Sequence, residues 1–292
     1  SSRRHDPHRV VMVGRAGAVR PCGPLSPACA ARAPMEQRPV CHSGRMHSPD
    51  PLLMTAAGRD DGGTGPGARR RARLAASRLY VCTDLQRFLR PDGTLDTAAF
   101  ADFCAAAFRG GVDVIQVRDK AVDVAVELAA FATLVPLARE HGALSAANDR
   151  ADVAALAGVD VFHTGQTDLT TAQCRALLGP DVVLGRSCHT EAQVRGARAE
   201  DGLDYFCTGP VWATPTKPGR AAVGLELPTL AARLDAEDPA GARPWFAIGG
   251  VDADRLPEVR AAGAERIVVV RAVTQAEDPE AAARTLRAGL PG

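Results

Sequence analysis

The stretch "VDVIQVRDKAVDVAVELAAFATLVPLAREHGALSAANDR" (residues 112–150) contains one complete structural unit. A short apolar run at 112–117 ends in polar residues, a longer apolar and charged run follows at 125–141, and a second short apolar run begins after Gly142. Short apolar runs bounded by turn signals predict buried strands, and the longer run predicts a helix. Glycine is a frequent helix C-cap. The stretch therefore predicts a strand–helix–strand unit with parallel strands.

The same alternation continues on both sides of this unit. Further strand candidates are "RLYVCTD" (78–84), "VDVFHTGQ" (159–166), "DVVLGRSCH" (181–189), "LDYFCTGP" (203–210), "PWFAIGG" (244–250) and "RIVVVRAV" (266–273), each followed by a helical pattern or a long loop. Eight such units over residues 78–292 favour an α/β fold of the (β/α)8 TIM-barrel type. The competing architecture is a doubly wound open sheet. It would normally carry a glycine-rich loop after the first strand, and "VCTDLQRF" contains no glycine.

Residues 1–77 have a different composition. They carry 13 arginines against 5 acidic residues, and Pro, Gly, Arg and Ser recur without a helical or strand period. A segment of this kind cannot bury enough apolar area to offset its ordering entropy. We interpret it as a low-complexity, disordered and dispensable leader, with Met35, Met46 and Met54 as alternative starts, so that a chain beginning near Arg70 should fold and stay active. A basic targeting or nucleic-acid-binding arm is the alternative.

Composition narrows the class of partner and the compartment. Residues 78–292 carry 22 basic against 29 acidic residues, which argues against a nucleic-acid surface. No apolar run approaches the ~20 residues of a membrane helix, and the first residues do not form a signal peptide. Eight cysteines without a C-x-x-C pair are typical of reduced thiols. We expect a cytoplasmic protein that acts on small molecules, with homo-oligomerisation left open.

Two residue types are rare in this chain and draw attention to their positions. Only Lys120 and Lys217 are lysines among 35 basic residues, and Asn148 is the single asparagine. A lysine ammonium is a compact point charge that a guanidinium does not replace. An asparagine side chain offers a donor and an acceptor together. These positions are therefore candidates for ligand contacts.

In a (β/α)8 barrel the active site forms where the strands end. That rule gathers the cations Arg118, Lys120 and Lys217 with the carboxylates Asp149 and Asp168. Mg²⁺ prefers oxygen ligands and is commonly held by one or two carboxylates plus substrate phosphates. The set predicts a site for a magnesium-bound diphosphate. A second phosphate site is predicted at "IGG" (248–250) and the turn after "VVVR" (268–271), whereas His163, on an apolar strand, is interpreted as a core histidine.

Six motifs in order make the prediction more specific. Residues 78–290 resemble the thiamine-phosphate synthase family through "QVRDK" (116–120), "NDRADVA" (148–154), "HTGQTDL" (163–169), "GRSCHT" (185–190), "GPVWATPTKPG" (209–219) and "AIGGV" (247–251). Two departures stand out. The family's last motif usually ends Val-Ser, where this chain has Val270 and Arg271, and Thr164 stands where a larger apolar residue is common.

The resemblance implies a reaction and a role for each matching residue. Hydroxymethylpyrimidine diphosphate and a thiazole phosphate would give thiamine phosphate and pyrophosphate, through Mg²⁺-assisted departure of the diphosphate and capture of a pyrimidine carbocation. By this resemblance the pyrimidine diphosphate would contact Gln116, Arg118, Lys120, Asn148, Ser187 and Lys217, with Arg118, Lys120, Ser187 and Lys217 as the catalytic set. Asp149 and Asp168 would hold Mg²⁺, and Thr214, Pro215, Thr216, Gly250, Val270 and Arg271 would surround the thiazole phosphate.

Two alternative functions, and the closure of one loop over the site, are also considered. A thiazole tautomerase-like isomerase would share the barrel, but would lack the full diphosphate-binding set. A non-catalytic barrel that binds a phosphorylated ligand would bind substrate without releasing pyrophosphate. The loop 212–220 is long for a strand-to-helix connection, so we predict that it closes over the site as a lid.

Overall fold

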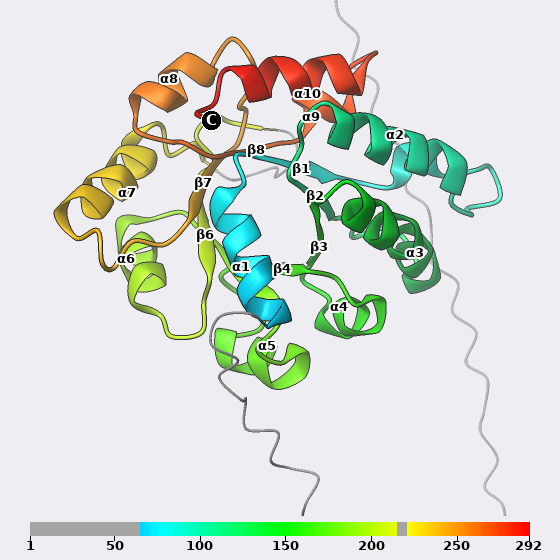
Figure 1. The fold of residues 1–292 in the computed structure, drawn as a ribbon, viewed down its shortest axis with the longest axis horizontal. Coiled ribbons are helices and arrows are strands. Elements are labelled where there is room, and N and C mark those ends of the chain that lie inside the picture. Colours follow the sequence, from blue (N-terminus) through cyan, green and yellow to red (C-terminus); the bar gives the residue numbers. More distant parts are fainter. Residues whose placement is uncertain (1–64, 215–220) are drawn as a thin grey trace, which may run out of the picture. The chain divides into compact units, whose positions relative to one another are not determined.

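The computed structural model describes residues 65–214 and 221–292. All eight predicted strands are present and form a closed parallel barrel in sequence order, with β8 paired to β1 (Figure 1). The strands are β1 (Leu79–Thr83), β2 (Val114–Val117), β3 (Leu144–Asn148), β4 (Val161–Thr164), β5 (Val183–Cys188), β6 (Tyr205–Thr208), β7 (Trp245–Ile248) and β8 (Ile267–Val269). The predicted (β/α)8 barrel is confirmed, and the open sheet is excluded.

Helices cover the outside of the barrel. They are α2 (Thr97–Arg109), α3 (Val124–Glu140), α4 (Ala151–Ala157), α5 (Thr171–Leu178), α6 (Glu191–Ala199), α7 (Glu226–Glu237), α8 (Leu256–Ala261), α9 (Arg271–Thr274) and α10 (Pro279–Ala288), with a short 3-10 turn η2 (Gln86–Phe88) after β1. Local sequence fixes several of their starts. Asp96 accepts a hydrogen bond from the N–H of Ala99 at the start of α2, and Thr170 forms a reciprocal capping box with Gln173 at the start of α5.

Strand alternation divides the apolar side chains into two cores. In β1, Leu79 and Val81 pack in the core between strands and helices, whereas Tyr80 and Cys82 pack in the barrel interior. Successive strand residues face opposite sides of a sheet, and here both sides are covered. This explains why the strands read as continuous apolar runs. It also means that every second strand residue points at the barrel axis.

Helix α1 (Pro66–Ala76) lies within the segment that the sequence assigned to the leader, so that prediction is wrong for these residues. Leu74 is 1% exposed and joins the interior apolar cluster. The Nε atom of Arg70 lies 2.8 Å from Oδ1 of Asp160, and the N–H of Gly67 donates to Asp181. The arginines suggested a solvated segment, but the carboxylates paired with Arg70 and Arg71 directly precede the distant strands β4 and β6. The leader prediction for residues 1–64 lies outside the described residues.

The described cysteines fit the predicted reduced thiols. Cys104, Cys174 and Cys188 are buried and free, and Cys82 and Cys207 are buried as well. Burial raises the pKa of Cys188 to about 12, so this thiol stays protonated and unreactive at neutral pH. Cys22, Cys29 and Cys41 lie outside the described residues. Within the described ranges, no helix is both long enough and apolar enough to span a membrane.

Candidate active site

The predicted diphosphate-binding residues gather where β2 to β5 end. Gln116 lies in β2, and Arg118 and Lys120 lie within the three residues that follow this strand. Asn148 ends β3, and Ser187 lies near the end of β5. Neighbouring strands are parallel, with Asn148 in register with His163 of β4. The barrel therefore brings residues that are far apart in sequence to one rim.

Two carboxylates and a lysine form the charged centre of this rim. Nζ of Lys120 lies 2.7 Å from Oδ2 of Asp149, and the Asp168 carboxyl group is close enough to shift the pKa of Asp149. The N–H of Gly165 donates to Oδ2 of Asp168 at 2.7 Å. Asp149 has a backbone φ of 59°, a left-handed conformation that Asp and Asn tolerate better than most residues. The turn after β3 therefore aims this carboxylate at its neighbours.

The two carboxyl groups titrate as a pair. Burial, together with the nearby Asp168, raises the pKa of Asp149 above its usual value, although Lys120 acts in the opposite direction. For Asp168, burial also acts to raise the pKa, but the Gly165 N–H, the Asp149 side chain and Lys120 outweigh it and lower the pKa. Two carboxyl groups this close share a proton more readily than they both ionise. A bound cation would remove that conflict.

Two half-buried polar side chains at the ends of the neighbouring strands β2 and β3 have no partner within the described part of the chain. The guanidinium of Arg118 and the side-chain amide of Asn148 make no hydrogen bond or ion pair to another described residue. Partly buried polar groups usually bond to protein or solvent. A cation and an amide left open at the same rim as a carboxylate pair suit an anionic ligand with a polar ring.

A chain of hydrogen bonds runs through the barrel interior below this rim. Nε2 of His163 lies 3.0 Å from Oγ of Ser187, and Nδ1 lies 3.0 Å from the hydroxyl of Tyr205. Tyr205 contacts the hydroxyl of Tyr80 at 3.3 Å, which in turn accepts from Nε2 of Gln116 at 2.9 Å. The interpretation of His163 as a core histidine is confirmed, since it is buried with both ring nitrogens bonded. The two tyrosines were not predicted as site residues, although both are inward-facing residues of predicted strands.

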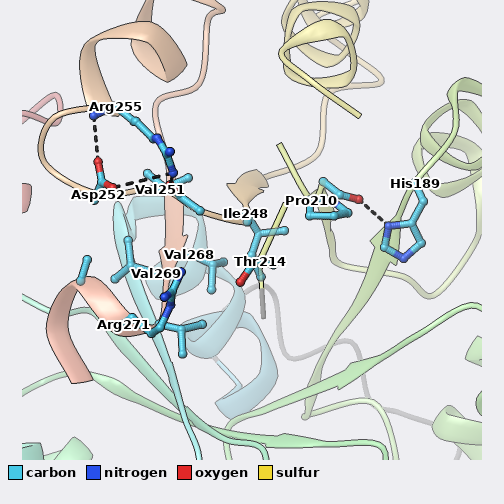
Figure 2. A pocket seen from close by; sticks show the side chains of 15 residues that line it. His189, Pro210, Thr214, Ile248, Val251, Asp252, Arg255, Val268, Val269 and Arg271 are labelled. Carbon is cyan, nitrogen blue, oxygen red and sulfur yellow. Dashed lines mark hydrogen bonds and ion pairs between the residues drawn. The ribbon is translucent and has the colours of Figure 1, made fainter. Parts of the chain in front are cut away.

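A cavity of about 320 Å³ opens at the ends of β6 to β8. Figure 2 shows Arg255 and Asp252 on one side of it and His189 on the other, with Thr214 and Ile248 between them. Of the predicted thiazole-phosphate residues, the cavity is lined by Thr214, Gly250, Val270 and Arg271. Three further lining residues were not predicted for this site, although each lies after the end of a strand: His189, Asp252 and Arg255.

Glycine is required where this cavity meets β7. Gly249 has a φ of 103°, and a Cβ built on it would lie 2.5 Å from Cα of Pro210. The neighbouring turn is held by Arg255, whose Nη1 donates to the carbonyl of Gly250 at 2.9 Å. The guanidinium of Arg255 also lies 5.0 Å from the centroid of the Trp212 ring. These contacts fix one wall of the cavity, and Arg255 and Arg271 both line it.

The remaining predicted residues lie outside the described part of the structure. Pro215, Thr216 and Lys217 belong to residues 215–220, and the predicted lid includes the same segment. Their assigned roles stay predictions. Among the described residues, the predicted diphosphate-binding side chains lie at the ends of β2 to β5, and the predicted thiazole-phosphate residues lie at the ends of β6 to β8, which follow in the barrel.

The fold and the two clusters define a (β/α)8-barrel protein with a carboxylate–lysine centre and a separate cavity at the carboxyl ends of its strands. The family described as thiamine monophosphate synthase matches residues 80–273. Thiamine-phosphate synthase of Arthrobacter sp. (strain FB24) is 51% identical over 236 residues, covering 75% of this chain and 96% of the relative. Its counterpart in Mycobacterium tuberculosis (strain ATCC 25177 / H37Ra) is 51% identical over 228 residues, covering 75% and 97%.

A solved structure agrees with these sequence matches. The thiamine phosphate pyrophosphorylase of Pyrococcus furiosus superposes with a TM-score of 0.60 at 29% identity, covering 75% of this chain and 96% of that protein. A 3-hexulose-6-phosphate synthase superposes with a TM-score of 0.51 at 21% identity, which shows the shared barrel fold alone. This chain belongs to the thiamine monophosphate synthase family and is an enzyme of the transferase class.

Proposed function

We propose that this protein joins hydroxymethylpyrimidine diphosphate to a thiazole phosphate, giving thiamine phosphate and pyrophosphate. The C–O bond between the pyrimidine methylene and the diphosphate breaks, and its electron pair leaves with the diphosphate. The lone pair of the thiazole nitrogen then forms the new C–N bond to the methylene carbon. Atoms and charge balance without a protein nucleophile, so the residues need only bind, orient and stabilise charge.

The observation that carries this proposal is the charged cluster of Lys120, Asp149 and Asp168 at the strand ends. Arg118 follows β2 and Asn148 ends the neighbouring β3, and neither side chain has a partner among the described residues. Phosphate oxygens would be stabilised by the two cations. The amide of Asn148 can donate and accept, which suits the edge of an aminopyrimidine ring. Lys120 neutralises Asp149 in this structure. If a bound diphosphate takes the Lys120 ammonium as its own partner, the Asp149 carboxylate needs another cation.

The donor set fits Mg²⁺ in that role. Among the described residues no three His, Cys, Asp or Glu side chains gather into a metal site, so this pair offers carboxylate oxygens only. Mg²⁺ is commonly bound by one or two carboxylates, with waters and substrate phosphates completing its shell. When bound by Asp149 and Asp168, it would neutralise charge that develops on the departing diphosphate.

The cavity at β6 to β8 supports a site for the thiazole phosphate. Arg271 and Arg255 supply positive charge at its wall, and the Gly249–Gly250 turn lets a ligand approach the backbone. Arg271 stands where the family usually has serine, so we propose that its charge replaces a hydroxyl contact to the phosphate. The aliphatic lining from Ile248, Val268 and Val270 would hold the ring and limit the access of water to the carbocation.

Metal titration of Asp149→Asn tests the charged centre. Asparagine tolerates the left-handed backbone at this position, so the turn should persist. Loss of one anionic ligand is expected to raise the Mg²⁺ concentration for half-maximal pyrophosphate release by about 10- to 100-fold. Asp152→Asn is the matched control, because that aspartate is exposed and pairs with Arg150. Equal Mg²⁺ requirements in both variants would contradict the proposed metal site.

The same assay separates the two alternatives. An isomerase would convert the thiazole phosphate without the pyrimidine substrate and without releasing pyrophosphate. A non-catalytic barrel would bind the pyrimidine diphosphate in calorimetry and release nothing. The diphosphate-binding set favours the transferase over the isomerase, because an isomerase requires no site for a diphosphate; its members are Arg118, Lys120, Asp149 and Asp168. Release of pyrophosphate separates the transferase from a barrel that only binds.

A further inference from the structure

The hydrogen-bond chain in the barrel interior has a direction, which is set at Gln116. The S–H of Cys82 donates to Oε1 of Gln116 at 3.3 Å, and Nε2 of Gln116 donates to the hydroxyl oxygen of Tyr80 at 2.9 Å. An amide nitrogen can only donate. Turning the amide over would set its nitrogen against the sulfur of Cys82, a weak acceptor. The observed orientation is therefore the better one, and it makes the Tyr80 oxygen an acceptor.

Each following proton then has one place to go. The Tyr80 hydroxyl has two hydrogen-bond partners among the described residues, Gln116 and Tyr205, so its own proton goes to the Tyr205 oxygen. The Tyr205 proton in turn goes to Nδ1 of His163. If the chain ran the other way, the Tyr80 proton would be buried without an acceptor, which is disfavoured. Burial raises the pKa of both tyrosines well above the usual value, so each keeps its proton.

The direction decides the tautomer of His163 and the role of Ser187. With Nδ1 accepting from Tyr205, a neutral imidazole carries its proton on Nε2. That Nε2–H donates to Oγ of Ser187, which lies 3.0 Å away. Ser187 is 3% exposed and accepts this bond, so its own hydroxyl proton remains to be donated. The resemblance assigned Ser187 to substrate contact without a direction, and the interior chain supplies one.

We infer that Tyr205 and His163 are positioning residues that make Ser187 a hydrogen-bond donor to the pyrimidine diphosphate. The inference rests on the proposed function for the identity of the ligand. A donor strengthens its bond as negative charge grows on the acceptor, so a proton directed outward from Ser187 favours diphosphate departure. Gly185 makes the arrangement possible, because a Cβ there would lie 2.0 Å from Cζ of Tyr205.

The tautomer can be read without any substrate. The full chain labelled with ¹⁵N-histidine would be examined by long-range ¹H–¹⁵N correlation, with the His163 signal assigned by its loss in His163→Asn. The result expected is an Nε2–H tautomer. Tyr80→Phe should keep that tautomer, because the Tyr205 bond to Nδ1 remains. An Nδ1–H tautomer or an imidazolium in the unsubstituted protein would overturn the inference, whether or not the protein makes thiamine phosphate.

Kinetics test the consequence for Ser187. Tyr205→Phe removes the donor to Nδ1 and should lower kcat/KM for the pyrimidine diphosphate about tenfold. In a Ser187→Ala background the same change should have little further effect, because the chain acts through that hydroxyl. An equal loss in both backgrounds would show that Tyr205 serves only packing, and would overturn the positioning role. Should Tyr205→Phe fold poorly, the spectrum of the unsubstituted protein still decides the direction.

Discussion

Replacing Gly185 by alanine tests the packing around Tyr205 that the hydrogen-bond chain in the barrel interior requires. In the structure a Cβ at this position would lie 2.0 Å from Cζ and 2.1 Å from Cε1 of Tyr205, far inside the ~3.5–4.0 Å of a normal carbon contact. Overpacking of a core costs about 1–3 kcal/mol. Displacing the ring also breaks its hydrogen bonds to His163 and Tyr80, at about 1 kcal/mol each. We expect Gly185→Ala to lower the free energy of unfolding by about 3–5 kcal/mol.

Urea denaturation followed by circular dichroism measures this change, and the chain offers a matched control. Gly196 lies in α6, is exposed, and would place its Cβ in open space. Gly196→Ala should therefore raise the free energy of unfolding by about 0.4–1 kcal/mol. The cost of Gly185→Ala should shrink in a Tyr205→Val background, where the ring is gone. A loss below about 1 kcal/mol for Gly185→Ala would refute the interior placement of Tyr205.

Three further changes have definite outcomes. A chain beginning at residue 65 should melt like the full chain, whereas one beginning at residue 78 loses Leu74 and should melt about 5–10 °C lower in a thermal scan. Burial raises the pKa of Glu127 in the folded protein, so this carboxyl group ionises at a lower pH in the unfolded chain and the stability falls as pH rises above the usual glutamate range. Glu127→Gln should therefore raise the melting temperature at pH 7.5. The gain should vanish when the melting temperature is measured near pH 4. Arg271→Ser should raise the KM for thiazole phosphate about tenfold while leaving the KM for the pyrimidine diphosphate unchanged, and the exposed Arg233→Ser on α7 should change neither.

The strand ends of the candidate site were predictable because two local rules act together. Apolar runs of the right length fix the strands, and parallel pairing then brings Gln116, Asn148 and Ser187 to one rim wherever the intervening helices lie. The motifs add residue identity to these positions. Neither rule needs a long-range contact to be known in advance.

The hydrogen-bond chain in the barrel interior and the packing of helix α1 depend on long-range contacts, which no local sequence pattern predicts. Tyr80 and Tyr205 look like ordinary apolar strand residues, and only the barrel's closure brings their hydroxyl groups to 3.3 Å. Gly185 gives no turn signal either, since its role is to leave room for a ring 20 residues further along the chain. The arginines of α1 look solvated until Asp160 and Asp204 are placed beside Arg70 and Arg71.

The identity of the products tests the central claim most directly. The full chain would be incubated with hydroxymethylpyrimidine diphosphate, thiazole phosphate and Mg²⁺, with each substrate omitted in turn, and the mixture analysed by mass spectrometry. The account predicts thiamine phosphate and pyrophosphate in equal amounts, only when both substrates are present. Isomerised thiazole phosphate without pyrophosphate, or bound substrate that is never converted, would contradict it.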